Sequence, residues 1–392
     1  MDTAFDLQVR DMAASLGFSE PVYVTRPNLP PLEEVVNTLR PAWEHRWITN
    51  DGELHSRLES ELARLLGTPH LNLFCNGTVA LMTAIKALDL ESGSVITTAF
   101  TFPATVNVLH WSGLRPVFCD IDRDTYNLNP DLLESLVTRD TRAILPVHVY
   151  GTPCDTDRIE AIATRHHLPV IYDAAHAFGV RRRGKSILCH GDISMLSFHA
   201  TKIFTTAEGG ALATRNADLH KRLRLLKNFG ITGEETVAAP GINGKMNELQ
   251  AALGLAQLDG VEANLEKRKH LAALYAQRLG REPGLVMLDV PEDVDHNYAY
   301  FPVRVKKDRF GLDRDQLYLL LKAFNIHSRK YFHPLCSTHA WCREPEGALP
   351  ESESAAREVL CLPLYASLPN DWVARICDII LRLHALAGKQ GS

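Results

Sequence analysis

The two residues of this chain best suited to catalysis are Lys202 and Asp173. Lys202 ends the run Ser197-Phe-His-Ala-Thr-Lys202, on a strand-to-loop turn, and Asp173 ends an apolar strand. A lysine can form a Schiff base with an aldehyde, and a buried carboxylate can keep a pyridine nitrogen protonated so that the ring accepts electrons. Together the two residues predict a site for pyridoxal 5'-phosphate (PLP).

A phosphate group would need its own site. Cys75-Asn-Gly-Thr-Val places Gly77 and Thr78 at a strand-to-helix junction, where backbone N–H groups and the helix dipole face an anion. Ser197 adds a second hydroxyl close to the lysine. Taken alone, the junction is better explained by a helix N-cap at Asn76 or Thr78, and Ser197 is explained equally well by an ordinary strand end.

An aromatic ring beside the site could stack on a pyridine ring. Phe100-Thr-Phe-Pro-Ala-Thr105 follows an apolar strand, and Phe102 is the predicted stacking residue in preference to Phe100. The alternative is a phenylalanine buried in the core.

These residues must be positioned by alternating strands and helices. Leu54, Leu58, Leu62 and Leu65 recur at helical spacing, as do the apolar residues from Thr78 to Leu88. Short apolar runs between such segments predict an α/β domain with a mostly parallel, mixed sheet covered on both faces, whose ligands bind beyond the carboxyl ends of the strands. The predicted strands are 71–74, 95–98, 116–119, 143–147 and 170–172.

The pattern changes near residue 261. A long polar-apolar helix from Val261 is followed by a strand at 301–305 and helices at 314–322 and from Asp371. The sequence therefore predicts two domains: a large PLP-binding α/β domain with the N-terminal segment (1–260), and a small C-terminal α+β domain (261–392).

Composition excludes several classes of protein. The 392 residues are 45% hydrophobic and 23% charged with a net charge of −5, so there is no basic surface for nucleic acid. No apolar run is long enough for a membrane span, and the N-terminus does not resemble a signal peptide. The eight cysteines show no metal-binding spacing and read as buried thiols. We expect a cytoplasmic enzyme without a metal.

Six motifs together resemble the DegT/StrS family of PLP-dependent nucleotide-sugar aminotransferases. The resemblance runs from about Pro27 to the C-terminus. The motifs, in the family's order, are Asn76-Gly-Thr78, Phe100-Thr-Phe-Pro-Ala-Thr105, Asp173-Ala-Ala-His176, Ser197-Phe-His-Ala-Thr-Lys202, Glu208-Gly-Gly210 and Gly241-Ile-Asn-Gly-Lys-Met-Asn-Glu-Leu-Gln250.

The resemblance implies an aspartate-aminotransferase-like (fold type I) architecture and a homodimer with active sites at the subunit interface. It also implies roles for individual residues. Some relatives carry histidine in place of Lys202 and dehydrate sugars, so the lysine indicates an aminotransferase. The implied roles are Schiff base and proton shuttle for Lys202, the pyridine nitrogen for Asp173, the phenolic oxygen for His176, ring stacking for Phe102, phosphate contacts for Gly77, Thr78 and Ser197, and a phosphate contact from the neighbouring subunit for Asn243.

Substrate is indicated less directly. L-glutamate as amino donor is implied by the family. Three segments, 23–33, 47–52 and 328–335, are similar to the subgroup acting on dTDP-keto-6-deoxyhexoses, particularly enzymes making dTDP-4-amino-4,6-dideoxyglucose. Cationic and aromatic side chains in the last segment suit a nucleotide diphosphate, although its aromatic residues could equally pack the two domains together. The predicted substrate residues are Arg329, Lys330, Tyr331 and His333.

Two other functions stay open. The chain could aminate a dTDP-3-keto-6-deoxyhexose or a UDP-keto-sugar, because the motifs do not determine regiochemistry. It could also be a PLP-binding regulatory protein with little turnover, although the intact set of Lys202, Asp173 and His176 argues against this.

Overall fold

The computed structural model describes residues 4–342 and 348–388. Its centre is a four-stranded and a three-stranded sheet, which parallel bridges from Ile144 to Val170 and from Val147 to Asp173 join into one mixed sheet. Strand β10 runs in the direction opposite to the other six strands of this sheet. The strands in spatial order are β2 (His70–Phe74), β10 (Gly210–Thr214), β9 (Ile193–Ser197), β6 (Ile171–Asp173), β5 (Thr141–Ile144), β3 (Ser94–Thr97) and β4 (Arg115–Phe118).

All five predicted strands are confirmed to within a few residues, as are the predicted helices. Their apolar character has a direct cause, because both faces of the sheet are covered. Along β9, Ile193 and Met195 pack into one core cluster and Leu196 packs into another. The covering helices are α3 (Glu53–Leu66), α4 (Gly77–Ala87), α5 (Pro103–Trp111), α6 (Pro130–Leu133), α7 (Thr156–His166), α8 (Ala217–Leu226) and α9 (Glu248–Gln257).

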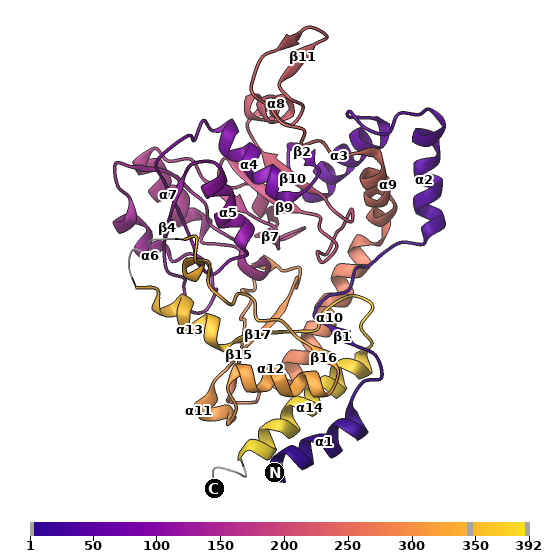
Figure 1. Cartoon of the computed structure of the whole chain (residues 1–392), viewed down its shortest axis with the longest axis vertical. Coiled ribbons are helices and arrows are strands. Elements are labelled where there is room, and N and C mark those ends of the chain that lie inside the picture. The colour runs from indigo at the N-terminus through magenta and orange to yellow at the C-terminus, as the bar shows by residue number, and fades with distance from the viewer. Residues whose placement is uncertain (1–3, 343–347, 389–392) are drawn as a thin grey trace.

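The C-terminal part has its own core and a three-stranded antiparallel sheet. Helix α10 (Val261–Leu279) runs into it from the large sheet (Figure 1). Its other elements are β13 (Leu285–Met287), β15 (Phe301–Val305), α11 (Lys307–Phe310), α12 (Arg314–Ala323), β16 (Ile326–His327), α13 (Pro350–Glu358), β17 (Val359–Leu362) and α14 (Asn370–Gly388).

The N-terminal segment lies with this C-terminal part and not with the large domain, to which the sequence pattern assigned it. Helix α1 (Ala4–Leu16) packs on α12 and α14, and Val9, Phe18 and Val22 are buried in the C-terminal core. Strand β1 (Val22–Tyr23) also pairs with β16. The segment is amphipathic, so its sequence shows that it must bury one face but not against which partner.

The remaining elements lie at the periphery. Helix α2 (Leu32–Glu44) packs on α9, and the hairpin of β11 (Ile231–Gly233) and β12 (Thr236–Val237) projects from the top of the molecule (Figure 1). A small sheet is formed by β7 (Arg181–Arg182), β8 (Lys185–Ser186) and β14 (Val294–Asp295). Within the described ranges no helix is long and apolar enough to cross a membrane.

Candidate active site

A pocket of about 610 Å³ lies where β2, β6 and β9 end, between the large sheet and the C-terminal part. It brings together residues from eight separate segments of the chain. Nine of the predicted site residues line it: Gly77, Thr78, Phe102, Asp173, His176, Ser197, Lys202, Arg329 and Tyr331.

Lys202 lies on a tight loop after β9. Its backbone N–H donates to His199 O at 2.9 Å, and the loop is anchored by Phe198 and Phe204, both fully buried. Helix α10 also holds the loop, through a 3.1 Å bond from the Asn264 amide to Ile203 O. Burial lowers the pKa of Lys202 to about 8, and the negative charge of Asp173 acts in the opposite direction. A substantial fraction of the amine is therefore neutral near pH 8.

Asp173 is 5% exposed at the end of β6. Its Oδ1 accepts a bond from Ala175 N at 3.0 Å, and its Oδ2 accepts one from Thr105 Oγ1 at 2.7 Å. Burial raises the pKa of this carboxyl, whereas both hydrogen bonds and the charge of Lys202 lower it. The site thus holds a buried acid with partners that favour its charged form.

The ring of His176 is held so that its Nε2–H can donate a hydrogen bond into the pocket. Its Nδ1 accepts a bond from Tyr150 N at 3.2 Å, and its ring lies parallel to that of Phe332, with the centroids 5.8 Å apart. Burial and the charge of Lys202 hold the pKa of His176 well below its usual range. A neutral ring that accepts at Nδ1 carries its proton on Nε2, so Nε2–H is available to an acceptor in the pocket.

The start of α4 has the geometry of an anion-binding cradle. Asn76 caps the helix by accepting from Val79 N at 2.8 Å, which leaves the first-turn N–H groups of Gly77 and Thr78 without an intrahelical partner. Gly210 closes the cradle from behind, because a Cβ there would lie 2.7 Å from Gly77 N. The N-cap interpretation of Asn76 is therefore correct and is compatible with anion binding.

The two candidate aromatic residues occupy different environments. Phe100 is fully buried against Tyr126 and Phe332, whereas Phe102 is 55% exposed and lines the pocket. An exposed ring at the mouth of a cavity can stack on a planar ligand. The preference for Phe102 over Phe100 is consistent with this geometry.

The predicted substrate residues are divided between two pockets. Arg329 and Tyr331 face both the main pocket and a neighbouring one of about 260 Å³, which also contains Lys330 and His333. Lys330 is already engaged: its ammonium lies 2.5 Å from Asp315 and 4.5 Å from the ring centroid of Tyr318. Arg329 is the exposed cation of this group that reaches the main pocket.

Asn243 does not line the pocket of its own chain. It is exposed beside the projecting hairpin, bridges Asn228 through its backbone and accepts a 2.9 Å bond from Lys245 Nζ. A role for Asn243 in an active site therefore requires a second copy of the chain.

Tyr300, Phe332 and Thr101 are among the pocket residues that were not predicted from the sequence. Tyr300 and Phe332 come from the C-terminal part, and the Lys202 ammonium lies 5.9 Å from the Tyr300 ring centroid. Thr101 precedes Phe102 and lines the same pocket. The two aromatic residues belong to no cofactor motif, so only packing of the two parts could reveal them.

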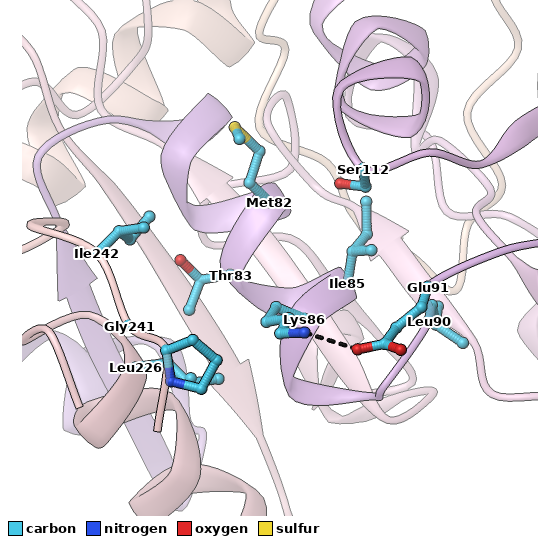
Figure 2. Close-up of a pocket in the computed structure, with 11 residues that line it drawn as sticks. Met82, Thr83, Ile85, Lys86, Leu90, Glu91, Ser112, Leu226, Gly241 and Ile242 are labelled. Carbon is cyan, nitrogen blue, oxygen red and sulfur yellow. Dashed lines mark hydrogen bonds and ion pairs between the residues drawn. The ribbon is translucent and has the colours of Figure 1, made fainter. Parts of the chain in front are cut away.

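A second pocket, of about 370 Å³, lies along α4 (Figure 2). Its lining is mainly aliphatic, with Met82, Ile85 and Ile242 around it and a 2.8 Å ion pair between Lys86 and Glu91 at one end. It contains none of the predicted site residues. In the described part of the chain, no group of three or more His, Cys, Asp or Glu side chains could hold a metal ion.

Comparison with known proteins places these features in a family. The model of the DegT/DnrJ/EryC1/StrS aminotransferase family matches residues 32–381. A dTDP-4-amino-4,6-dideoxy-D-glucose transaminase from Escherichia coli is 44% identical over 363 residues, which cover 91% of this chain and 97% of the relative.

Solved structures of other aminotransferases also match this chain. DesI, crystallised in the presence of its TDP-sugar product, superimposes with a TM-score of 0.90 at 36% identity and covers 96% of this chain and 95% of its own. PseC of Helicobacter pylori, an aminotransferase of pseudoaminic acid biosynthesis, has a TM-score of 0.87 at 26% identity, covering 93% of this chain and 100% of its own. The predicted fold type I α/β architecture is confirmed, and the chain belongs to the DegT/DnrJ/EryC1/StrS family of sugar aminotransferases.

Proposed function

We propose that this protein is a PLP-dependent aminotransferase that transfers the amino group of L-glutamate to C4 of dTDP-4-keto-6-deoxy-D-glucose, giving dTDP-4-amino-4,6-dideoxy-D-glucose. The observation that carries the proposal is the placement of Lys202 and Asp173 in one pocket of a chain 44% identical to such a transaminase. The TDP-sugar product named for DesI supports a thymidine-linked substrate.

The pocket fits PLP in the chemistry of its donors. Asp173 would hold the pyridine nitrogen, His176 Nε2–H would donate to the phenolic oxygen, and the free N–H groups of Gly77 and Thr78 would bind phosphate together with the Ser197 hydroxyl. Phe102 would cover one face of the ring. When bound, PLP supplies the electron sink for the reaction.

Lys202 is the general base and general acid of the proposed reaction. Its Nζ, with a pKa lowered to about 8, can accept a proton from the substrate carbon and deliver it to a neighbouring atom near neutral pH. Tyr300 packs over this amine, and Arg329 offers a positive charge at the pocket mouth for a substrate phosphate or carboxylate. The other side chains orient the reactants and limit access of water.

The proposal is tested by two half-reactions. The PLP-loaded protein is bleached with L-glutamate, freed of donor and mixed with dTDP-4-keto-6-deoxyglucose, while the visible band and the product NMR spectrum are followed. Return of the band with an equatorial amine at C4 is the expected result. Bleaching without return would redirect the search to 3-keto and UDP-linked sugars, and a visible band that no amino donor bleaches would favour a regulatory protein.

The lowered pKa of Lys202 predicts how the rate of cofactor attachment depends on pH. Only the neutral amine attacks an aldehyde, so the rate at which cofactor-free protein attaches PLP should rise about tenfold per pH unit below pH 8 and level off above it. Stopped-flow absorbance between pH 6 and 10.5 measures this. Asp173→Asn should move the plateau to lower pH, since Asp173 raises the pKa of Lys202. A rise that continues to pH 10 would contradict the lowered pKa.

We also propose that the chain forms a homodimer in which Asn243 of the partner subunit completes each site. Exposed apolar side chains gather on the segment that carries Asn243, and the hairpin within it projects from the molecule (Figure 1). Such a segment can insert into a second copy. The exposed residues are Phe229 (45%), Ile231 (45%), Val237 (69%) and Ile242 (40%).

Mixed protomers test this arrangement. Lys202→Ala and Asn243→Ala protomers are unfolded and refolded together. Half of the dimers should then be mixed, and each mixed dimer should contain one native site and one inactive site. About a quarter of the wild-type activity should therefore return. Mixing Lys202→Ala with Asp173→Ala is the control, because both residues line the same pocket and no native site can form. Recovery equal to that of the control would place Asn243 outside the site.

A further inference from the structure

Behind Asp173 lies a pair of threonine hydroxyls, Thr101 and Thr105, to which the motif that carries Phe102 assigns no role. Thr105 is fully buried, Thr101 is 1% exposed, and their Oγ1 atoms are 2.8 Å apart. Thr105 Oγ1 also lies 2.7 Å from Asp173 Oδ2. The first turn of α5 thus places Phe102 at the pocket and Thr105 against the carboxylate.

The direction of these bonds follows from counting hydrogens. An ionised carboxylate only accepts, so the single hydroxyl hydrogen of Thr105 must be donated to Asp173. Thr105 can then only accept from Thr101, which fixes the chain as Thr101 to Thr105 to Asp173. A protonated Oδ2 would reverse both bonds, so the donor order from Thr101 to Thr105 to Asp173 belongs to the ionised carboxylate, and the Thr105 bond lowers the pKa of Asp173.

Few of the groups around Asp173 favour its ionised form. Burial raises the pKa of Asp173 and opposes its ionisation, and the pKa is lowered by the bonds from Thr105 and Ala175 and by the charge of Lys202. The neighbouring His176 imidazole and Cys154 thiol are kept neutral by burial, because the pKa of His176 is lowered and that of Cys154 is raised. His148, which donates its backbone N–H to Asp173 O, is also buried and neutral, with its pKa lowered to about 3.

We propose that Thr105, oriented by Thr101, is a positioning residue that keeps Asp173 ionised and fixes the plane of its carboxylate for the pyridine nitrogen of the cofactor. This inference rests on the proposed function. With Ala175 N on Oδ1 and Thr105 Oγ1 on Oδ2, both oxygens are held, so the carboxylate cannot rotate without breaking a bond. The remaining lone pairs are free to accept from a protonated ring nitrogen.

The test replaces Thr105 by valine, which has the same shape and no hydroxyl. In cofactor-free protein with ¹³C-labelled aspartate carboxyls, assigned with Asp173→Asn, the titration midpoint of Asp173 should rise by about one pH unit in Thr105→Val. With PLP bound, Kd should increase about tenfold, as expected for a lost hydrogen bond to a charged group. The pH midpoint of the visible band should also rise, because a less protonated ring leaves the imine more basic.

Two matched variants separate positioning from folding. Thr105→Ser keeps the hydroxyl and should restore all three readouts. Thr97→Val removes another fully buried hydroxyl, which donates at 2.7 Å to Leu145 O, and should leave all three unchanged. Unchanged midpoints and Kd in a folded Thr105→Val, or failure of the serine variant to restore them, would overturn the inference. Wild-type protein that develops no visible band with PLP would overturn the proposed function as well.

Discussion

Lys202→Ala is expected to lower the rate of amino-group transfer from L-glutamate by about ten-thousand-fold or more. In the proposed mechanism the change removes both the nucleophile that attaches the cofactor and the base that moves the proton, and no other lysine is among the described residues that line the pocket. Single-turnover bleaching of the PLP-loaded protein by L-glutamate measures the effect.

Covalent attachment provides an independent check. After borohydride reduction, mass spectrometry should find a PLP adduct on the Lys202 peptide of the wild-type protein and none in Lys202→Ala. Lys185→Ala is the control, since Lys185 is exposed on β8 outside the pocket. An adduct that persists in Lys202→Ala, or a rate within tenfold of wild type, would show that another lysine holds the cofactor.

Asp173→Asn is expected to slow the same half-reaction by about 100- to 1000-fold. The amide has the shape of the carboxylate but no charge to keep the ring nitrogen protonated, which weakens the electron sink. Its NH₂ group must also face one of two donors, Ala175 N–H or Thr105 O–H, because both oxygens of Asp173 accept bonds. PLP affinity should therefore fall together with the rate.

A surface aspartate gives the matched control for that variant. Asp293 pairs with Arg182 and Arg183 away from the pocket, so Asp293→Asn should change neither the rate nor the PLP affinity. Exposed ion pairs of this kind contribute little to stability. A rate for Asp173→Asn within tenfold of wild type would mean that the ring nitrogen does not bind at Asp173.

Much of the site could be predicted because its parts follow strand ends. Asn76, Asp173 and Ser197 come after or at the ends of β2, β6 and β9, and parallel strands end at one edge of a sheet. The lysine, the aspartate and the glycine-threonine pair were therefore recognisable from residue type and order. The antiparallel β10 between β2 and β9 was not predicted, because a short apolar run does not indicate its direction.

The sequence by itself determined the α/β class, the motifs of the candidate cofactor site and the choice of Lys202 and Asp173 as its candidate residues, since apolar periodicity and residue order are local properties of the chain. The tertiary structure decided which distant segments complete the site. Tyr300 and Phe332 reach the pocket from the C-terminal part, and Thr105 reaches Asp173 from another helix. Such contacts depend on how packed elements meet, and this long-range geometry has no periodic signature in sequence.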